Sequence, residues 1–544
     1  MIFMYLLFLL CNAFMYASLP PYLDTSEWAE QTLAKLTLEE KIAQILMIKM
    51  PAQNHQSFEK YKELLRYPVG GIFLHGKNTI TEQIKLTNFL QGLNNIPLLV
   101  GQDLEWGLNM RLEDGINFPR ALTLGALQDF DLICQLAALI AQQCKKLGVH
   151  LPAAPVVDIN TNPSNPVIGF RSFGDDKYQV AAKTLAFIKG LQENYILACA
   201  KHFPGHGDTE VDSHKNLPVV KHTQKRLDEI ELYPFKQAIQ AGVATIMSAH
   251  LLVNVHDNQK SATLSKKIIT DLLKKQLGFK GIVITDALSM KAITKHNKPA
   301  QANIDAFLAG NDILLYPKDI PETIEELKSI ITKSPELQKQ LDASVFKILQ
   351  AKEWLNLHRK RFVEEITAKD INTKEAFALK KQLYSAAITV VRDDNKMIPL
   401  QSAPQPNPLF IHLGQKFFNQ FEEICEQNLN ICANQDLYNL ATKEQMDNFF
   451  NYRSTQNNSS IICLLRTTQR GVVEEHHLNF INRLHEQNNQ VTTVLFGSPY
   501  TLKKLHPSIP TIVAYEDDPD AEEAAAKVLF GNQPALGQLP ITLE

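Results

Sequence analysis

The N-terminal part of the chain alternates short apolar runs with segments of helical periodicity, and this alternation constrains the fold more than any other feature. The apolar runs occupy residues 45–50, 70–75, 97–103, 148–158, 197–203, 244–250, 281–287 and 312–316. Between them, residues 131–148 and 179–192 carry apolar side chains at helical spacing, and each segment ends near a glycine. Alternating strands and helices favour a parallel sheet, and eight such units within roughly 300 residues predict a closed (β/α)8 barrel of the TIM type.

Polar side chains cluster where the predicted strands end. Such residues are Asp103, Asp158, Lys201, His202, His250 and Asp286. In (β/α)8 barrels the chemistry takes place at the C-terminal ends of the strands, because the loops that follow them form one face. We therefore expect a functional site at this end of the barrel.

A second domain is predicted after the barrel, since 544 residues exceed what a single core usually serves. Ser334 and Pro335 are a typical N-cap and first residue of a helix, which would link the two domains. Short apolar runs return at residues 409–414, 460–466, 492–497 and 511–517, followed by a helical segment at 521–529. We expect a barrel with its helical linker over residues 25–360 and a smaller α/β sandwich domain over 380–544.

The first 17 residues are almost wholly apolar and predict an export leader, although no Lys or Arg precedes Lys35. The expected location is the periplasm or the medium, with membrane association through the leader. The cytoplasm is the alternative if the leader does not function. A net charge of −3 gives no basic footprint, so nucleic acid is not an expected partner.

The segment KHFPGHGDTEVDSH, residues 201–214, admits several interpretations. Its potential metal ligands match none of the standard zinc spacings, and it lacks the lysine and hydroxyl residue of a phosphate-binding loop. A structural turn would explain its glycines and proline. A catalytic interpretation rests on Asp212 and His214, which flank Ser213 and in an extended loop lie on the same side. A carboxylate that orients an imidazole makes an acid/base dyad.

Asp286, at the end of the seventh predicted strand, could serve such a dyad as a nucleophile that forms a covalent sugar intermediate. An aspartate at a strand end is equally often the N-cap of the helix that follows. The residues by themselves leave both roles open for Asp286.

Together with 201–214, the motifs DLEWGLNMRL, APVVDIN, RSFGDD and TDALSM resemble the glycoside hydrolase family 3 β-N-acetylglucosaminidases, the NagZ-like branch with two domains. The resemblance extends over residues 25–360 and into the C-terminal domain. It implies a retaining, exo-acting hydrolase that removes terminal non-reducing β-linked N-acetylglucosamine through a glycosyl-aspartate. The expected substrate is a β-N-acetylglucosaminyl oligosaccharide or a muropeptide, from peptidoglycan or chitin-type turnover.

The resemblance also implies roles for individual residues. Asp286 is the expected nucleophile, His214 the general acid/base and Asp212 its partner. The side chains expected to bind sugar hydroxyls are Asp103, Arg111, Arg171, Lys201 and His202. No metal or other cofactor is expected.

Four alternatives stay open at this point. They are a β-N-acetylglucosaminide phosphorylase or a β-glucosidase of the same family, a sugar-binding protein without activity, and a metal-dependent hydrolase. The sequence departs from shorter branch members where Trp106 and Leu108 replace a glycine and an arginine. We expect this departure to affect details of the sugar-binding subsite and not the activity. A monomer and a homodimer are both compatible with the sequence.

Overall fold

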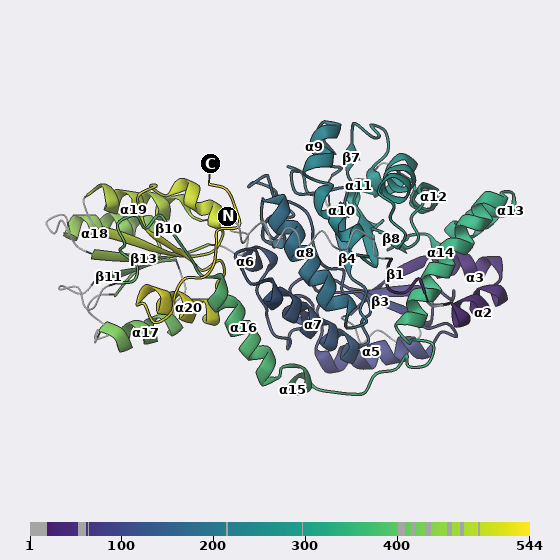
Figure 1. Ribbon diagram of the computed structural model, residues 1–544, viewed down its shortest axis with the longest axis horizontal. Helices are drawn as coiled ribbons and strands as arrows, with labels where there is room; N and C mark the ends of the chain where they lie inside the picture. The colour runs from purple at the N-terminus through teal and green to yellow at the C-terminus, as the bar shows by residue number, and fades with distance from the viewer. Residues whose placement is uncertain are drawn as a thin grey trace, which may run out of the picture. The chain divides into compact units, whose positions relative to one another are not determined.

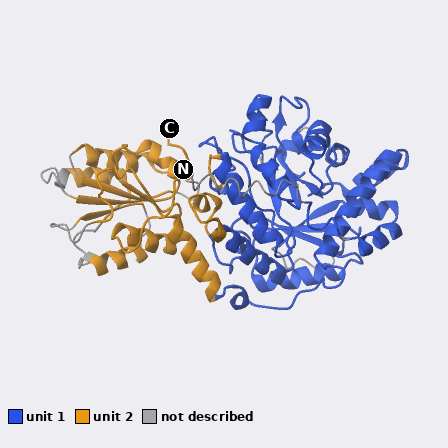
Figure 2. Cartoon of the chain, viewed as in Figure 1, with its two compact units in different colours: residues 1–118, 133–172, 177–373 blue, residues 119–132, 173–176, 374–544 orange. Residues whose placement is uncertain are grey.

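The computed structural model describes residues 19–24, 26–52, 61–63, 65–213, 216–295, 297–400, 408–414, 419–429, 437–453, 460–467, 473–487 and 490–543. The expected leader, residues 1–17, and the expected acid/base His214 lie outside these ranges. The chain divides into two compact units (Figure 2). Unit 1 comprises residues 1–118, 133–172 and 177–373, and unit 2 comprises residues 119–132, 173–176 and 374–544.

Unit 1 contains the predicted barrel. Its strands are β1 (Leu46–Pro51), β2 (Gly71–His75), β3 (Leu99–Gln102), β4 (Cys199–Phe203), β6 (Thr245–Ser248), β8 (Ile282–Thr285) and β9 (Leu314–Leu315). They form two parallel sheets, in the orders β3-β2-β1-β9 and β4-β6-β8. Parallel bridges between Gly101 and Leu151, Val156 and Lys201, and Ile284 and Ile313 join the two sheets into a ring. A short parallel pair, β5 (Val219–Val220) with β7 (Leu252–Val253), lies apart from this ring.

The apolar run at residues 148–158, expected to be the fourth strand, forms no strand. Pro152 and Pro155 have no backbone N–H to donate, and Ala153 adopts a left-handed conformation with φ of 42°. The run still takes the place of the fourth strand, between β3 and β4, and isolated hydrogen bonds join it to both. Leu151 N donates to Val100 O at 3.1 Å, and Val157 N donates to Lys201 O at 2.8 Å.

Helices surround the strands of unit 1 in Figure 1. They are α2 (Glu27–Lys35), α3 (Leu38–Gln44), α5 (Ile80–Gly92), α7 (Phe130–Leu147), α8 (Lys177–Gln192), α9 (Gln224–Glu229), α10 (Tyr233–Gln240), α11 (Lys291–Thr294), α12 (Pro299–Ala309), α13 (Ile320–Thr332), α14 (Pro335–Trp354) and α15 (Ala368–Ile371), with a π-helix η4 (Lys267–Gln276). The predicted start of α14 is confirmed, since the Ser334 side chain accepts a hydrogen bond from Leu337 N at 3.3 Å.

Unit 2 contains a six-stranded sheet in the order β10-β15-β14-β13-β11-β12. Its strands are β10 (Thr389–Val391), β11 (Leu409–Leu413), β12 (Leu437–Leu440), β13 (Ser460–Arg466), β14 (Gln490–Phe496) and β15 (Thr511–Val513). Only the edge strand β10 is antiparallel to its neighbour. Figure 1 shows α18 (Lys443–Arg453) and α19 (Glu475–Glu486) over one face, and α16 (Lys374–Ala387), α17 (Asn419–Leu429) and α20 (Pro519–Leu529) over the other. The predicted α/β fold is thus confirmed.

Two short segments from within the barrel sequence belong to unit 2, which departs from the sequential division expected for the domains. The first contains α6 (Ala121–Gly125), and Glu516, whose side chain is 10% exposed, accepts hydrogen bonds from Arg120 N at 2.8 Å and Thr123 Oγ1 at 2.5 Å. In the second, Asp175 N donates to Pro540 O at 3.1 Å. No helix in the described part of the chain has the length and apolar character needed to cross a membrane.

Candidate active site

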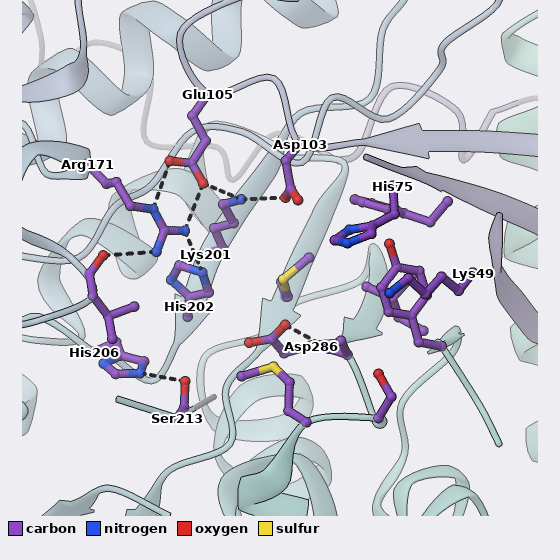
Figure 3. Close-up of a pocket in the computed structure, with 18 of the residues that line it drawn as sticks. Lys49, His75, Asp103, Glu105, Arg171, Lys201, His202, His206, Ser213 and Asp286 are labelled. Carbon is purple, nitrogen blue, oxygen red and sulfur yellow. Dashed lines mark hydrogen bonds and ion pairs between the residues drawn. The ribbon is translucent and has the colours of Figure 1, made fainter. Parts of the chain in front are cut away.

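A pocket of about 340 Å³ opens at the C-terminal ends of the barrel strands (Figure 3). Six of the side chains expected at the site line it: Asp103, Arg111, Arg171, Lys201, His202 and Asp286. Asp212 is half-buried and is not among the lining residues, whereas its neighbour Ser213 is buried and does line the pocket. The loop that carries the expected dyad therefore reaches the pocket at Ser213.

The barrel topology explains why these residues meet. Asp103 directly follows β3, and Asp286 directly follows β8. Lys201 and His202 are among the last three residues of β4. Because all the barrel strands are parallel, their C-terminal ends lie at one face of the ring. Residues far apart in the sequence are thereby brought to one pocket.

Asp103 forms two ion pairs in the pocket. Its Oδ2 lies 2.6 Å from Arg111 Nη2, and its Oδ1 lies 3.3 Å from Lys201 Nζ. Burial alone would raise the pKa of Asp103, but the charges of Lys201 and Arg111 outweigh it and hold the pKa below its ordinary value. Asp103 is therefore an ionised acceptor, suited to binding a sugar hydroxyl.

Glu105, two residues after Asp103, is a site residue that the sequence analysis missed. Its carboxylate accepts two hydrogen bonds from Arg171, at 2.9 Å from Nε and 2.7 Å from Nη2. The same carboxylate lies 2.7 Å from Lys201 Nζ. Burial raises the pKa of Glu105, yet Arg171 and Lys201 reverse this effect and bring the pKa well below its ordinary value. Glu105 thus pairs with two cations, the buried Lys201 and the half-buried Arg171 (Figure 3).

Lys201 is almost wholly buried, with 1% of its side chain exposed. Burial lowers its pKa, but the adjacent carboxylates of Glu105 and Asp103 raise it above the ordinary value. Lys201 is therefore a fixed cation held between two acids. A buried charge held in this way forms strong hydrogen bonds to a polar ligand.

The ring of His202 is held in one orientation by its two neighbours. Its Nδ1 lies 2.7 Å from Asp158 Oδ2, and its Nε2 lies 3.2 Å from Arg171 Nη2. Because the guanidinium can only donate, Nε2 accepts, and the ring proton resides on Nδ1 and is donated to Asp158. Both ring nitrogens of His202 are thus engaged within the protein.

His206 is equally enclosed. Its Nδ1 lies 2.6 Å from Thr209 Oγ1 and its Nε2 lies 3.3 Å from Ser213 Oγ. Burial first, and the proximity of His202 second, lower the pKa of His206 to about 4. His206 is therefore neutral near pH 7 and supports the loop instead of carrying an acidic proton.

The loop after β4 depends on two glycines. Gly205 has φ of 130°, in the region that favours glycine. At Gly207 a Cβ atom would overlap the backbone carbonyl of Ile159. Further along, Asp208 Oδ2 lies 2.9 Å from His222 Nε2 and 3.8 Å from Arg226 Nη2. Tight backbone packing and these ion pairs fix the loop up to residue 208, before the expected dyad.

Asp286 lies in the pocket opposite the cations (Figure 3). Its backbone N donates to Ser248 O at 2.9 Å, which continues the barrel ladder, and its Oδ1 accepts a hydrogen bond from Ala287 N at 2.7 Å. His250, another expected strand-end residue, does not line the pocket. Its Nε2 lies 3.0 Å from Ala287 O, so it supports the turn that carries Asp286.

The remaining wall contains Lys49, His75 and Tyr316, which the sequence analysis also missed. Lys49 Nζ lies 5.5 Å from the centre of the Tyr316 ring, and the rings of His75 and Tyr316 meet edge to face at 6.3 Å. Burial, then Lys49 and Arg111, lower the pKa of His75. Lys49 lies near the end of β1 and His75 is the last residue of β2. Nothing in the sequence distinguishes the two from other surface residues. In the described ranges, no group of three or more His, Cys, Asp or Glu side chains is arranged to hold a metal ion.

Comparison with known proteins adds independent findings. Residues 37–351 match the model of the family described as glycosyl hydrolase family 3 N terminal domain. Beta-hexosaminidase A of Pseudoalteromonas piscicida is 29% identical and covers 88% of this chain and 90% of its own length. A beta-N-acetylglucosaminidase/beta-glucosidase of Cellulomonas fimi is 26% identical, covering 72% of this chain and 71% of its own. The solved structure of a glycoside hydrolase family 3 beta-N-acetylglucosaminidase from Paenibacillus sp. str. FPU-7 has a TM-score of 0.78 and 27% identity, covering 93% of this chain and 99% of that one.

Proposed function

The chain belongs to glycosyl hydrolase family 3, and on that premise we propose that it is a retaining, exo-acting β-N-acetylglucosaminidase. The observation that carries the proposal is the pocket in which Asp286 faces a set of ion-paired cations. A carboxylate at this position can attack an anomeric carbon, while fixed charges opposite it bind the sugar's hydroxyl groups. The substrate class is a β-N-acetylglucosaminyl oligosaccharide or a muropeptide.

In the first step, Asp286 attacks the anomeric carbon of the terminal sugar. A bond forms between a carboxylate oxygen of Asp286 and that carbon, and the glycosidic bond breaks with its electron pair passing to the leaving oxygen. The hydrogen bond from Ala287 N to Oδ1 orients the carboxylate. Water then opens the glycosyl-aspartate with retention of configuration.

The leaving oxygen needs a proton, and we assign its donor as His214 with Asp212 as partner. The other two histidines of the loop support this assignment by elimination. His202 has both ring nitrogens engaged by Asp158 and Arg171, and His206 is neutral at pH 7 with both of its nitrogens hydrogen-bonded. Ser213, adjacent to His214, lines the pocket.

The sugar's hydroxyl groups are bound in this proposal by Asp103, Arg111, Arg171 and Lys201, and His202, expected to bind them too, acts by holding Arg171 at 3.2 Å from its Nε2. Hydrogen bonds to ionised groups are about twice as strong as neutral ones, which suits recognition of a polar ring. Each of the three cations is paired with Asp103 or Glu105.

The test is release of 4-nitrophenol from the β-N-acetylglucosaminide and the β-glucoside by the wild type, Asp286→Ala and His214→Ala. We expect cleavage of the N-acetylglucosaminide alone, with both variants slower by several orders of magnitude. Asp271→Ala is the control, since the Asp271 side chain is 43% exposed, pairs with Lys275 and lies outside the pocket. Unchanged activity of Asp286→Ala would refute the nucleophile, and faster release with phosphate than without it would favour a phosphorylase.

A further inference from the structure

A second pocket of about 320 Å³ lies at the opposite end of the barrel, within unit 1. Its wall includes His150, at the start of the bridging run 148–158, and Tyr195 and Ile196, which precede β4. The rest of the wall comes mainly from residues 354–363, after α14. These residues lie where strands begin, whereas the candidate active site lies where strands end. The proposed reaction makes no use of this pocket.

The pocket carries uncompensated positive charge. Lys145, Lys360 and Arg361 line it, and none of the lining side chains is acidic. None of the three cations forms an ion pair with another described residue. Arg361 Nη1 is held instead by the carbonyl oxygen of Asn94 at 2.7 Å, which leaves its charge unbalanced. A concave site with this charge attracts anions.

His150 adds a hydrogen-bond donor to the same wall. Its side chain is 7% exposed, and its Nδ1 accepts a hydrogen bond from Val100 N at 3.0 Å, so the ring proton lies on Nε2. Nε2 has no partner among the described residues. Burial, and then the charge of Lys352, keep the ring neutral by lowering its pKa to about 3. The Nε2–H of His150 can therefore donate to a ligand that enters the pocket.

Aromatic rings lie beside these polar groups. The ring centres of Tyr195 and Trp354 are 5.3 Å apart, with an angle of 34° between their planes, and Tyr195 is 56% exposed. Lys145 Nζ lies 5.3 Å from the centre of the Tyr195 ring. Exposed aromatic faces provide a rigid apolar surface for the C–H face of a sugar ring. The wall therefore combines an anion site with a ring-binding surface.

We propose that this pocket binds an acidic sugar, a pyranose ring that bears a carboxylate. The ring packs on Tyr195 and Trp354, and the carboxylate is bound by Lys360, Arg361 and the Nε2–H of His150. A neutral sugar would leave the cations and the imidazole without an acceptor. A small inorganic anion would leave the aromatic surface uncovered. The inference does not depend on the proposed glycosidase activity, because the two pockets share no residue.

The experiment is isothermal titration of the full-length protein with glucuronate, glucose and inorganic phosphate. Glucuronate and glucose differ only at C6, so the comparison isolates the carboxylate. We expect glucuronate to bind with one-to-one stoichiometry and both other ligands to bind at least about tenfold more weakly. Equal affinity for glucose would overturn the role of the charge, and equal affinity for phosphate would overturn the role of the rings. Absence of glucuronate binding would overturn the proposal altogether.

Two variants locate the binding. Lys360→Gln removes one charge from an exposed residue, and Tyr195→Asn removes the ring while tolerating the left-handed φ of 55° at this position. We expect each to weaken glucuronate binding by about tenfold without changing glycosidase activity. Tyr178→Gln is the control, because Tyr178 is 58% exposed and has Lys177 Nζ 5.1 Å from its ring centre but lies outside the pocket. Unchanged affinity in both variants, or an equal loss in Tyr178→Gln, would place the ligand elsewhere and refute the site.

Discussion

The carboxylate of Glu105 meets the guanidinium of Arg171 in a two-point contact, at 2.9 Å from Nε and 2.7 Å from Nη2. This geometry fixes the plane of the guanidinium as well as its position. Arg171 Nη2 in turn lies 3.2 Å from His202 Nε2, so the orientation of one glutamate is transmitted to two expected sugar-binding side chains. Glu105 is a positioning residue that acts through its partners.

Replacing Glu105 with glutamine should therefore impair both stability and activity. The change keeps the shape of the side chain but removes the negative charge beside Lys201 and Arg171. Loss of one partner from a buried ion pair lowers the free energy of unfolding by about 3 kcal/mol. We expect kcat/KM to fall by about 100-fold, because the cations shift relative to the sugar. Urea unfolding and kinetics on the 4-nitrophenyl substrate measure the two effects. Glu113→Gln, an exposed position in the same segment, should change neither.

The stability of the protein should decrease as the pH is lowered, because of His206. In the unfolded chain this histidine has an ordinary pKa of 6.5, and in the folded protein its pKa is about 4. Between these values the unfolded state binds more protons, so acidification favours unfolding. Lowering the pH from 7 to 5 should cost about 2 kcal/mol through His206 alone. His206→Asn should lose correspondingly less stability over this interval in urea unfolding. Identical pH dependence in variant and wild type would contradict the assignment.

The close approach of Gly207 to Ile159 predicts a local effect on the catalytic loop. A methyl group at residue 207 would overlap the Ile159 carbonyl, so Gly207→Ala must displace the loop that leads to Ser213 and His214. A displacement of about 1 Å lowers activity by about 100-fold. In Gly92→Ala the new methyl group would meet only Phe362, at 4.0 Å, and activity should be unchanged. Steady-state kinetics of the two variants, with thermal unfolding as a check on folding, test this difference.

The pH dependence of the reaction should be bell-shaped. In the proposed mechanism Asp286 must be ionised to attack and His214 must be protonated to release the leaving sugar, so activity should fall at both extremes. In His214→Ala the residual activity should lose its alkaline limb while the acid limb remains. A pH profile of kcat/KM for the wild type and the variant decides the point. Persistence of the alkaline limb in the variant would show that another group donates the proton.

The fold could be predicted from the sequence wherever local pattern and tertiary structure agree. The runs that become β1, β2, β3, β4, β6, β8 and β9 are apolar and uninterrupted, and the structure confirms them as strands. The run at 148–158 has the same composition, but Pro152 and Pro155 remove the donors that a strand requires. An apolar composition indicates that a segment is buried. Whether the buried segment pairs with its neighbours as a strand depends on its backbone N–H donors.

Part of the candidate site could be predicted from strand ends, and the motif resemblance also predicted Arg111 and Arg171, which line the pocket. Asp103, Lys201 and Asp286 follow from the rule that barrel chemistry lies at the C-terminal ends of strands. Glu105 escaped because its role depends on Arg171, 66 residues away, and a single sequence contains no record of that contact. Its one signal was its position two residues after Asp103, inside a motif already assigned to the site.

The two segments that unit 2 takes from the barrel sequence bear on how such a protein can evolve. The chain passes between the units after residues 118, 132, 172, 176 and 373. A fragment starting at residue 374 would lack the groups that donate hydrogen bonds to Glu516 and Pro540. One ending at residue 373 would retain those groups without their acceptors. A single recombination event at residue 373 would therefore exchange neither unit intact.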